Sequence, residues 1–166
     1  MADGDENQAQ INKKTIRHVE CVADVVDLAG YNGSVVSTKG FHKAINFALA
    51  QPYAGGASYV YNANMNRSLH NGGTTIAESK NFPSDWSVRT DVENWFSGVG
   101  LTGKGCWVLV YSGSVDVTHF GAIPQFSIGI DNSIAINKAL SIKNNIHIPT
   151  GNYIVHRPTL THTAHP

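Results

Sequence analysis

Residues 105–122 read GCWVLVYSGSVDVTHFGA, which is the most strand-like stretch of the sequence. Two runs of β-branched and aromatic residues, 106–111 and 115–120, flank Ser112-Gly113-Ser114, a pattern typical of two strands joined as a hairpin. Side chains alternate along a strand, which places Cys106, Val108 and Val110 on one face of the first run and Trp107, Leu109 and Tyr111 on the other. Both faces are apolar, so we expect the strand to be covered on both sides.

Short strands are also expected on the N-terminal side of this stretch. Residues 35–38, 57–61 and 74–76 are rich in β-branched or aromatic residues and are bounded by turn formers. Residues 62–73 are interpreted as a long polar loop. The central sheet core, or a subunit interface, should contain Tyr59, Tyr61, Trp107, Val108 and Val110.

Several short helices are expected between the strands. Residues 15–29 fit a strand followed by a helix around Val22–Leu28, and a turn follows at 31–34. A helix over residues 41–50 should end before Pro52. Thr90 and Glu93 have the spacing of a capping box, which predicts a helix through Trp95 and Phe96.

The C-terminal part predicts a further helix between extended segments. Asp131-Asn132-Ser133 can cap a helix over Ile134–Ile142, whose apolar residues have helical spacing. Residues 146–155 then read as a strand, a Pro-x-Gly turn and a second strand.

Composition favours a mainly β fold with a few short helices, an α+β class. Of 166 residues, 42% are hydrophobic, which is enough for a core, while 14% are charged and 16 are glycine. The 12 basic and 12 acidic residues balance, so the chain has no electrostatic footprint for nucleic acid or anionic lipid. No apolar run is long enough for a transmembrane helix, so we expect no membrane insertion.

The first residues, MADGDENQAQ, lack the basic-then-apolar order of a signal peptide. We therefore expect synthesis in a cytoplasm without export by a leader. Cytoplasmic synthesis favours two buried, reduced thiols at Cys21 and Cys106 over a disulfide.

Three patterns suggest chemistry but have simpler explanations. Gly98-x-Gly100-x-x-Gly103 matches a nucleotide-binding loop, yet here the loop follows a helix and precedes a strand, the reverse of the required order. His156, His162 and His165 do not have the paired spacing of a zinc site. The carboxylates are sparse and helix capping explains several of them, so no facing pair for glycoside hydrolysis is visible. We expect no catalytic residues, no cofactor and no metal in this chain.

Two segments resemble a signature of bacteriophage tailspikes. Gly55–Ala63 with His70–Ile76 is similar to the family pattern GGGTFVYDAS…NNGGTI, and Gly105–Ala122 is similar to GCWVRQYSGAVNVKWFGA. Residues 129–140 and 146–155 occupy the places where the family opens a right-handed parallel β-helix of the pectate-lyase kind. The chain departs from the family at His119, where Trp is usual, and at Ile123–Ser127.

The resemblance implies a small β-rich connector domain followed by the helix cap and first coil of a right-handed parallel β-helix. We divide the chain into a polar N-terminal arm at 1–20, a connector at 21–122, and the capping helix with the first coil at 123–166. A single coil buries its face only by stacking on the next one, so its last strands need further cover.

The resemblance also implies a structural role in the virion, as the N-terminal anchor or adaptor that attaches a host-recognition spike to the tail. The implied partners are further copies of the chain in a homotrimer, phage tail or baseplate proteins, and host surface polysaccharide through a downstream shaft. The alternative is a capsular or O-antigen polysaccharide depolymerase, acting as a glycosidase or lyase through a β-helix. Because no paired-acid site is visible, the structural role is favoured.

The virion-docking site is expected in the arm, because the resemblance begins near residue 35. A segment that orders only on docking loses affinity to its ordering entropy, so it needs many contacts or threefold avidity. In the alternative interpretation, residues 35–121 dock and the arm is dispensable. The candidate docking residues are the apolar Ile11, Ile16 and Val19 and the basic Lys13, Lys14 and Arg17.

Overall fold

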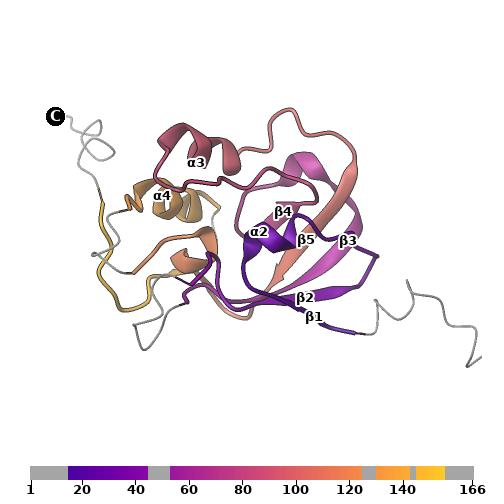
Figure 1. Ribbon diagram of the computed structural model, residues 1–166, viewed down its shortest axis with the longest axis horizontal. Helices are drawn as coiled ribbons and strands as arrows, with labels where there is room; N and C mark the ends of the chain where they lie inside the picture. Colours follow the sequence, from indigo (N-terminus) through magenta and orange to yellow (C-terminus); the bar gives the residue numbers. More distant parts are fainter. Residues whose placement is uncertain (1–14, 45–52, 125–129, 143–144, 156–166) are drawn as a thin grey trace, which may run out of the picture.

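The computed structural model describes residues 15–44, 53–124, 130–142 and 145–155. At its centre is a five-stranded sheet in the order β1-β2-β3-β5-β4, in which β1 and β2 are parallel and the other pairs are antiparallel (Figure 1). The strands expected at 35–38, 57–61 and 74–76 correspond to β2, β3 and β4. The bounds are Arg17–Val19 for β1, Val35–Thr38 for β2, Ser58–Asn66 for β3, Thr75–Ala77 for β4 and Lys104–Val110 for β5.

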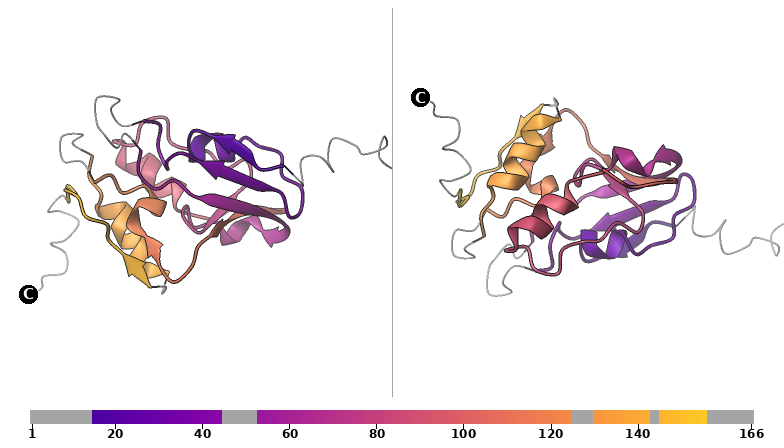
Figure 2. Two further views of the ribbon diagram at one scale, coloured as in Figure 1. Left: turned by 90° about the horizontal axis from the view of Figure 1, so that it is seen from below. Right: turned by 90° about the horizontal axis from the view of Figure 1, so that it is seen from above.

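A second, two-stranded parallel sheet and several short helices complete the described fold. The sheet pairs β6 (Val115–Asp116) with β7 (Ile146–His147). Figure 2 shows β6, β7 and α4 together at one end of the molecule, beside the five-stranded sheet. This arrangement confirms the α+β class. The helices are α2 (Val22–Val25), α3 (Arg89–Trp95), α4 (Ser133–Ser141), and the 3-10 turns η2 (Arg67–Leu69) and η3 (Val117–Phe120).

One face of the five-stranded sheet carries the core. Tyr61 and Ile76 lie opposite Trp107 on the two strands that flank β5. Trp107, Ile76 and Tyr59 are fully buried, and the valines of α2 belong to the same hydrophobic cluster. The predicted burial of Trp107, Tyr59 and Tyr61 is therefore confirmed.

The other face of this sheet is only partly covered. Val35, Val60 and Val108 lie opposite one another across β2, β3 and β5, and all three are half-buried. Cys106, at the start of β5, is fully buried, whereas Val110 at its end is 55% exposed. The prediction that β5 is covered on both faces is therefore correct at the start of the strand and wrong at its end.

The expected hairpin between 106–111 and 115–120 is wrong. β6 pairs in parallel with β7, where Val115 lies opposite Ile146, and the chain then turns into η3 instead of continuing as a strand. Side chains three residues apart share one side of a 3-10 turn, and Val117 and Phe120 are both fully buried. Gly121, with a φ of 93°, ends the turn in the left-handed region that glycine adopts without strain.

The expected polar loop at 62–73 is also wrong for its first part. β3 continues to Asn66, with Asn62 opposite Cys106 and Asn66 opposite Lys104 on either side of an irregularity in the ladder. The ladder forms between backbone groups, so polar side chains on the half-exposed face do not prevent it. Composition therefore did not indicate where this strand ends.

The predicted capping box of α3 does not form. The helix begins at Arg89 with Val88 as its N-cap, so Thr90 lies inside the first turn. Glu93 instead forms an i,i+4 ion pair with Arg89, at 3.4 Å between Nε and Oε2. The helix itself is confirmed through Trp95.

The other helix predictions agree in part. α2 ends at Val25, three residues before the predicted end. Of the helix expected over 41–50, residues 41–44 are not helical and the rest lies outside the described residues. α4 is confirmed, and Asp131 Oδ1 accepts from the Ser133 amide at 2.9 Å, as its position before the helix suggested.

Candidate functional site

Of the six candidate docking residues, three lie within the described part of the chain and three lie outside it. Ile11, Lys13 and Lys14 lie outside the described residues. Ile16 directly precedes β1 and is 51% exposed. Arg17 and Val19 lie in β1, paired with β2, so they form part of the sheet and not of a free arm.

Arg17 is engaged with the core of the domain. Its guanidinium carbon lies 5.5 Å from the centroid of the Trp107 ring, a distance at which a cation is attracted to the ring face. Its Nη1 donates to the Ala29 carbonyl at 3.2 Å. These contacts assign Arg17 a structural role, which leaves Ile16 as the exposed apolar candidate among the described residues.

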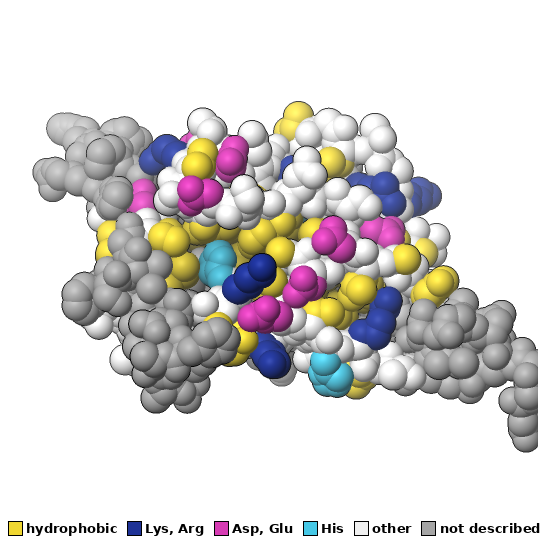
Figure 3. Space-filling view, in the orientation of Figure 1, with side chains coloured by type: hydrophobic (Ala, Val, Ile, Leu, Met, Phe, Trp, Pro, Cys, Tyr) yellow, Lys and Arg dark blue, Asp and Glu magenta, His cyan; other side chains and the backbone are white. Residues whose placement is uncertain are grey.

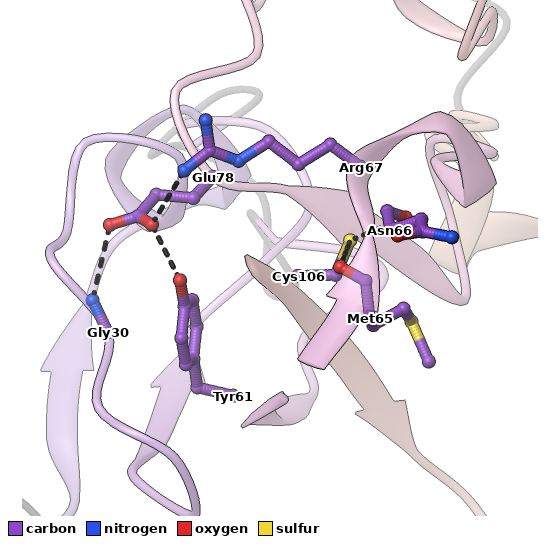
Figure 4. A network of polar contacts seen from close by, with 7 residues as sticks. All are labelled: Gly30, Tyr61, Met65, Asn66, Arg67, Glu78 and Cys106. Carbon is purple, nitrogen blue, oxygen red and sulfur yellow. Dashed lines mark hydrogen bonds and ion pairs between the residues drawn. The ribbon is translucent and has the colours of Figure 1, made fainter. Parts of the chain in front are cut away.

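A carboxylate that the sequence did not single out organises one end of the sheet (Figure 4). Glu78 Oε1 accepts from the Tyr61 hydroxyl at 2.6 Å and from Arg67 Nη2 at 3.3 Å, and Oε2 accepts from the Gly30 amide at 3.3 Å. Three donors from different segments thus converge on one carboxylate, which ties the loop after α2 to β3 and η2. The sequence signal that could have identified this role is the position of Glu78, an isolated acidic residue shortly after the strand predicted at 74–76.

Burial and this carboxylate determine the protonation of Tyr61. Desolvation is the larger cause, the hydrogen bond and the charge of Glu78 act in the same direction, and together they raise the pKa of Tyr61 to about 12. The phenol therefore remains a hydrogen-bond donor at every physiological pH. Gly105 leaves room for the phenol, because a Cβ at this position would lie 2.0 Å from the Tyr61 hydroxyl oxygen.

Asn132 connects the start of α4 to two other segments of the chain. Its Oδ1 accepts from the Ile123 amide at 2.7 Å, and its Nδ2 donates to the Ile123 carbonyl at 3.2 Å. Its own amide donates to the Ile154 carbonyl at 2.8 Å. This buried amide therefore joins the start of α4 both to the segment after η3 and to the segment after β7.

A cavity of about 470 Å³ lies between α2 and the loop that precedes α3. The rings of Phe82 and Trp86 stack at 5.4 Å in its wall, and His42 meets Trp86 edge-on at 4.6 Å. On the face shown in Figure 3, hydrophobic side chains gather in the middle of the molecule beside a histidine and a lysine. The cavity suits an apolar group better than a charged one.

His42 adds a neutral polar group to this cavity. Its Nε2 donates to the Gly121 carbonyl at 2.8 Å. Burial is the largest influence on the ring and lowers the pKa of His42 to about 4, so the ring is uncharged at neutral pH.

Neither a metal site nor a membrane span is present in the described part of the chain. No three histidine, cysteine, aspartate or glutamate side chains among these residues gather closely enough to hold a metal ion. None of the helices there has the length and apolar character needed to cross a bilayer.

No protein-family model matches the sequence, and no curated protein matches it. Among solved structures, the chain is similar to the gp42 tailspike of Acinetobacter phage vb_AbaP_AS12, with 26% sequence identity and a TM-score of 0.53. This match covers 80% of the present chain and 18% of that tailspike.

Two further solved tailspikes are similar to the chain. One is gp49 of Acinetobacter baumannii bacteriophage Fri1, described as a capsular polysaccharide depolymerase, with 17% identity, a TM-score of 0.49, and coverage of 81% of this chain and 21% of that one. The other, from Acinetobacter phage vB_ApiP_P1, has 24% identity, a TM-score of 0.45, and coverage of 79% and 18%.

The chain spans about a fifth of the length of each tailspike that it matches. The similarity to the AS12 tailspike covers most of the chain, and it agrees with the two sequence signatures. The match to the AS12 tailspike, together with the two sequence signatures, supports a relationship of this chain to bacteriophage tailspikes.

Proposed function

We propose that this chain is the anchor or adaptor part of a tailspike, the part that attaches the host-recognition spike to the phage tail. The observation that carries the proposal is the parallel pairing of β6 with β7, whose strands are connected through α4. Parallel sheets are normally covered on both faces and extended by further parallel strands. A connector sheet followed by this unit supports a domain that leads into a parallel β shaft.

Exposed apolar side chains near the junction support the same role. Leu140 of α4 is 56% exposed, and Ile148, directly after β7, is 53% exposed. Within the described residues β7 pairs with β6 alone, so its outer edge is open to a further strand. A coil stacked on β7 would cover both the apolar side chains and the open edge.

The partners in this proposal are those of a virion spike. Two further copies of the chain would complete a homotrimer, a tail or baseplate protein would hold it, and host surface polysaccharide would bind to the shaft. The chain would thus be located in the phage tail after synthesis in the host cytoplasm.

Docking to the tail is assigned to the residues that precede β1. Ile11, Lys13 and Lys14 supply apolar and basic side chains in a segment whose composition cannot form a core alone. Ile16 is exposed where this segment joins the sheet, whereas Arg17 and Val19 are engaged in β1. A deletion that tests docking should therefore stop before β1.

Removal of residues 2–14 is the decisive experiment. We expect the shortened chain to keep its unfolding midpoint, because β1 and the core are unchanged, and to lose attachment to phage particles that lack spikes. Attachment is measured by co-sedimentation with such particles. Undiminished attachment would contradict docking through the arm.

A charge-matched pair of variants separates the arm from the connector. Lys13→Glu/Lys14→Glu reverses two charges in the arm, and Lys39→Glu/Lys104→Glu reverses two exposed charges on the connector. We expect only the first pair to weaken attachment, and the reverse result would assign docking to residues 35–121. Clearing of host capsule by the chain alone would instead favour the depolymerase.

A further inference from the structure

His70 connects two segments through both of its ring nitrogens. Its side chain is 3% exposed and lies between η2 and β4. Nδ1 accepts from the Ala77 amide at 3.0 Å, and Nε2 lies 2.5 Å from the Trp95 carbonyl oxygen. An amide N–H can only donate and a carbonyl can only accept, so the ring must be neutral and carry its proton on Nε2.

These two bonds join the end of α3 to the end of β4. Trp95 is the last residue of α3 and Ala77 the last of β4. A second bond joins the end of α3 to the turn that precedes β4, because Trp95 Nε1 donates to the Gly72 carbonyl at 3.2 Å. The His70 and Trp95 rings meet edge-on at 4.8 Å. The C-terminal end of α3 is thus held on the sheet by a His70–Trp95 pair.

The charged groups that act on His70 are both positive. Lys80, which follows β4, and Lys138, on α4, each disfavour a charge on the ring. Lys80 also donates from Nζ to the Ser97 carbonyl at 2.8 Å, directly after α3. The groups of α3 and β4 that contact the His70 ring are the Trp95 carbonyl, the Trp95 ring and the Ala77 amide.

We propose that His70 is an acid-released latch that holds α3 against the five-stranded sheet. A second proton on the ring would occupy Nδ1, so that two donors, Nδ1–H and the Ala77 N–H, would face each other across 3.0 Å. The new charge would also be buried near Lys80 and Lys138. The ring then leaves, both of its bonds are lost, and the end of α3 is freed.

The sign of the pH effect follows from the direction of the pKa shift. Burial, with a smaller contribution from the two lysines, lowers the pKa of His70 from 6.5 to about 4. The stabilisation is therefore complete above pH 6.5 and is lost as the pH falls toward 4. For this one group, the unfolding constant should rise about twenty-fold between pH 7 and pH 5.

Comparison of two variants isolates this effect. The pKa values of His42 and His119 are also lowered by burial, so the whole chain loses stability in acid and only a difference between variants reports on His70. His70→Gln can place an amide donor near the Trp95 carbonyl but cannot titrate. His18→Gln removes an exposed histidine from β1 and serves as the control.

Urea unfolding at pH 7 and pH 5, followed by tryptophan fluorescence, gives the readout. We expect His70→Gln to be less stable at pH 7, yet to show a rise in its unfolding constant between the two pH values about twenty-fold smaller than that of the unmodified chain. His18→Gln should respond to pH as the unmodified chain does. An unchanged pH response in His70→Gln would overturn the latch.

A measurement on the unmodified chain keeps the test decisive if His70→Gln does not fold. NMR can follow the protonation of the His70 ring and the hydrogen-exchange protection of the Ala77 amide from pH 7 to pH 4. We expect both to change together as the pH falls toward 4. A doubly protonated ring with a fully protected Ala77 amide would equally overturn the proposal.

Discussion

The side chain of Trp107, on β5, packs against residues of three other strands, β1, β3 and β4. It extends from β5, meets the Tyr61 ring of β3 edge-on at 5.0 Å and lies opposite Ile76 of β4. The Arg17 guanidinium of β1 lies 5.5 Å from its ring centroid. Because these neighbours come from separate strands, the loss of the ring would leave a cavity that no single strand can close.

Replacement of Trp107 by alanine should therefore destabilise the chain by about 3–5 kcal/mol, the range for a large aromatic side chain in a packed core. Urea unfolding followed by circular dichroism measures the change. Val110→Ala, on the same strand but 55% exposed, is the control and should have little effect. An unchanged midpoint for Trp107→Ala would mean that the ring is not packed as described.

The two cysteines should be unreactive in the folded chain. Both are unpaired and buried, and they have different neighbours: Cys21 Sγ contacts Asp24, and Cys106 Sγ contacts the Asn66 carbonyl at 3.5 Å. Burial raises the pKa of both thiols, that of Cys106 to about 11, which keeps them protonated. Mass spectrometry should show alkylation only after denaturation. A Cys21–Cys106 bridge in fresh protein would contradict this assignment.

At the level of elements, the β6–α4–β7 unit is held by one buried amide and by one solvent-accessible hydrogen bond between side chains. Asn132 is 1% exposed and binds the backbone of Ile123 through both side-chain atoms. Asp116 and His147 lie opposite each other on β6 and β7, 2.9 Å apart, with 32% and 60% of their side chains exposed. The two contacts should differ greatly in their contribution to stability.

Asn132→Ala should cost about 1–3 kcal/mol, because the buried amide and carbonyl of Ile123 lose their partners. Asp116→Asn should cost about 0–1 kcal/mol, because a contact between such exposed side chains contributes little and asparagine can still cap η3. Urea unfolding of the two variants side by side tests this order. Equal losses in the two variants would contradict this order.

For the whole molecule, apolar side chains remain partly exposed on the outer face of the five-stranded sheet and near β7. The row Val35–Val60–Val108 is half-buried, and Val110 and Ile148 are more than half exposed. With no net charge to keep copies apart, association through apolar surface is favoured.

We therefore expect the chain to form a homotrimer, in which threefold packing covers part of this surface. Light scattering at micromolar concentration should give three times the monomer mass of 17.9 kDa. Val110→Asp, which places a charge on the outer face, should weaken the assembly if that face is the contact. A stable monomer of the unmodified chain would contradict the trimer.

Local pattern was sufficient where an element depends on its own residues. The turn at 31–34 closes with the Ser34 amide donating to the Tyr31 carbonyl at 2.7 Å. Asp131 accepts from the Ser133 amide at the start of α4, as its position before Ser133 suggested, although the N-cap residue is Asn132. The run of β-branched and aromatic residues at 106–111 likewise identified β5 and its buried Trp107. For the docking site, composition indicated the arm but could not tell which residues the sheet would engage.

Tertiary structure decided everything that depends on a distant partner. An extended run at 115–120 looks the same whether its partner is the preceding strand or one about thirty residues later, and only the packing of α4 brings β7 beside β6. Likewise, the pairing of β1 with β2 places Arg17 and Val19 in the sheet and not in the arm. The hydrogen bonds of His70 form only because Ala77 and Trp95 lie close to it in the folded chain. The physical reason is that a backbone amide, a carbonyl or a ring nitrogen can bond to any suitable partner, so local sequence does not specify which distant segment supplies it. The partner is determined by which segments the fold brings together.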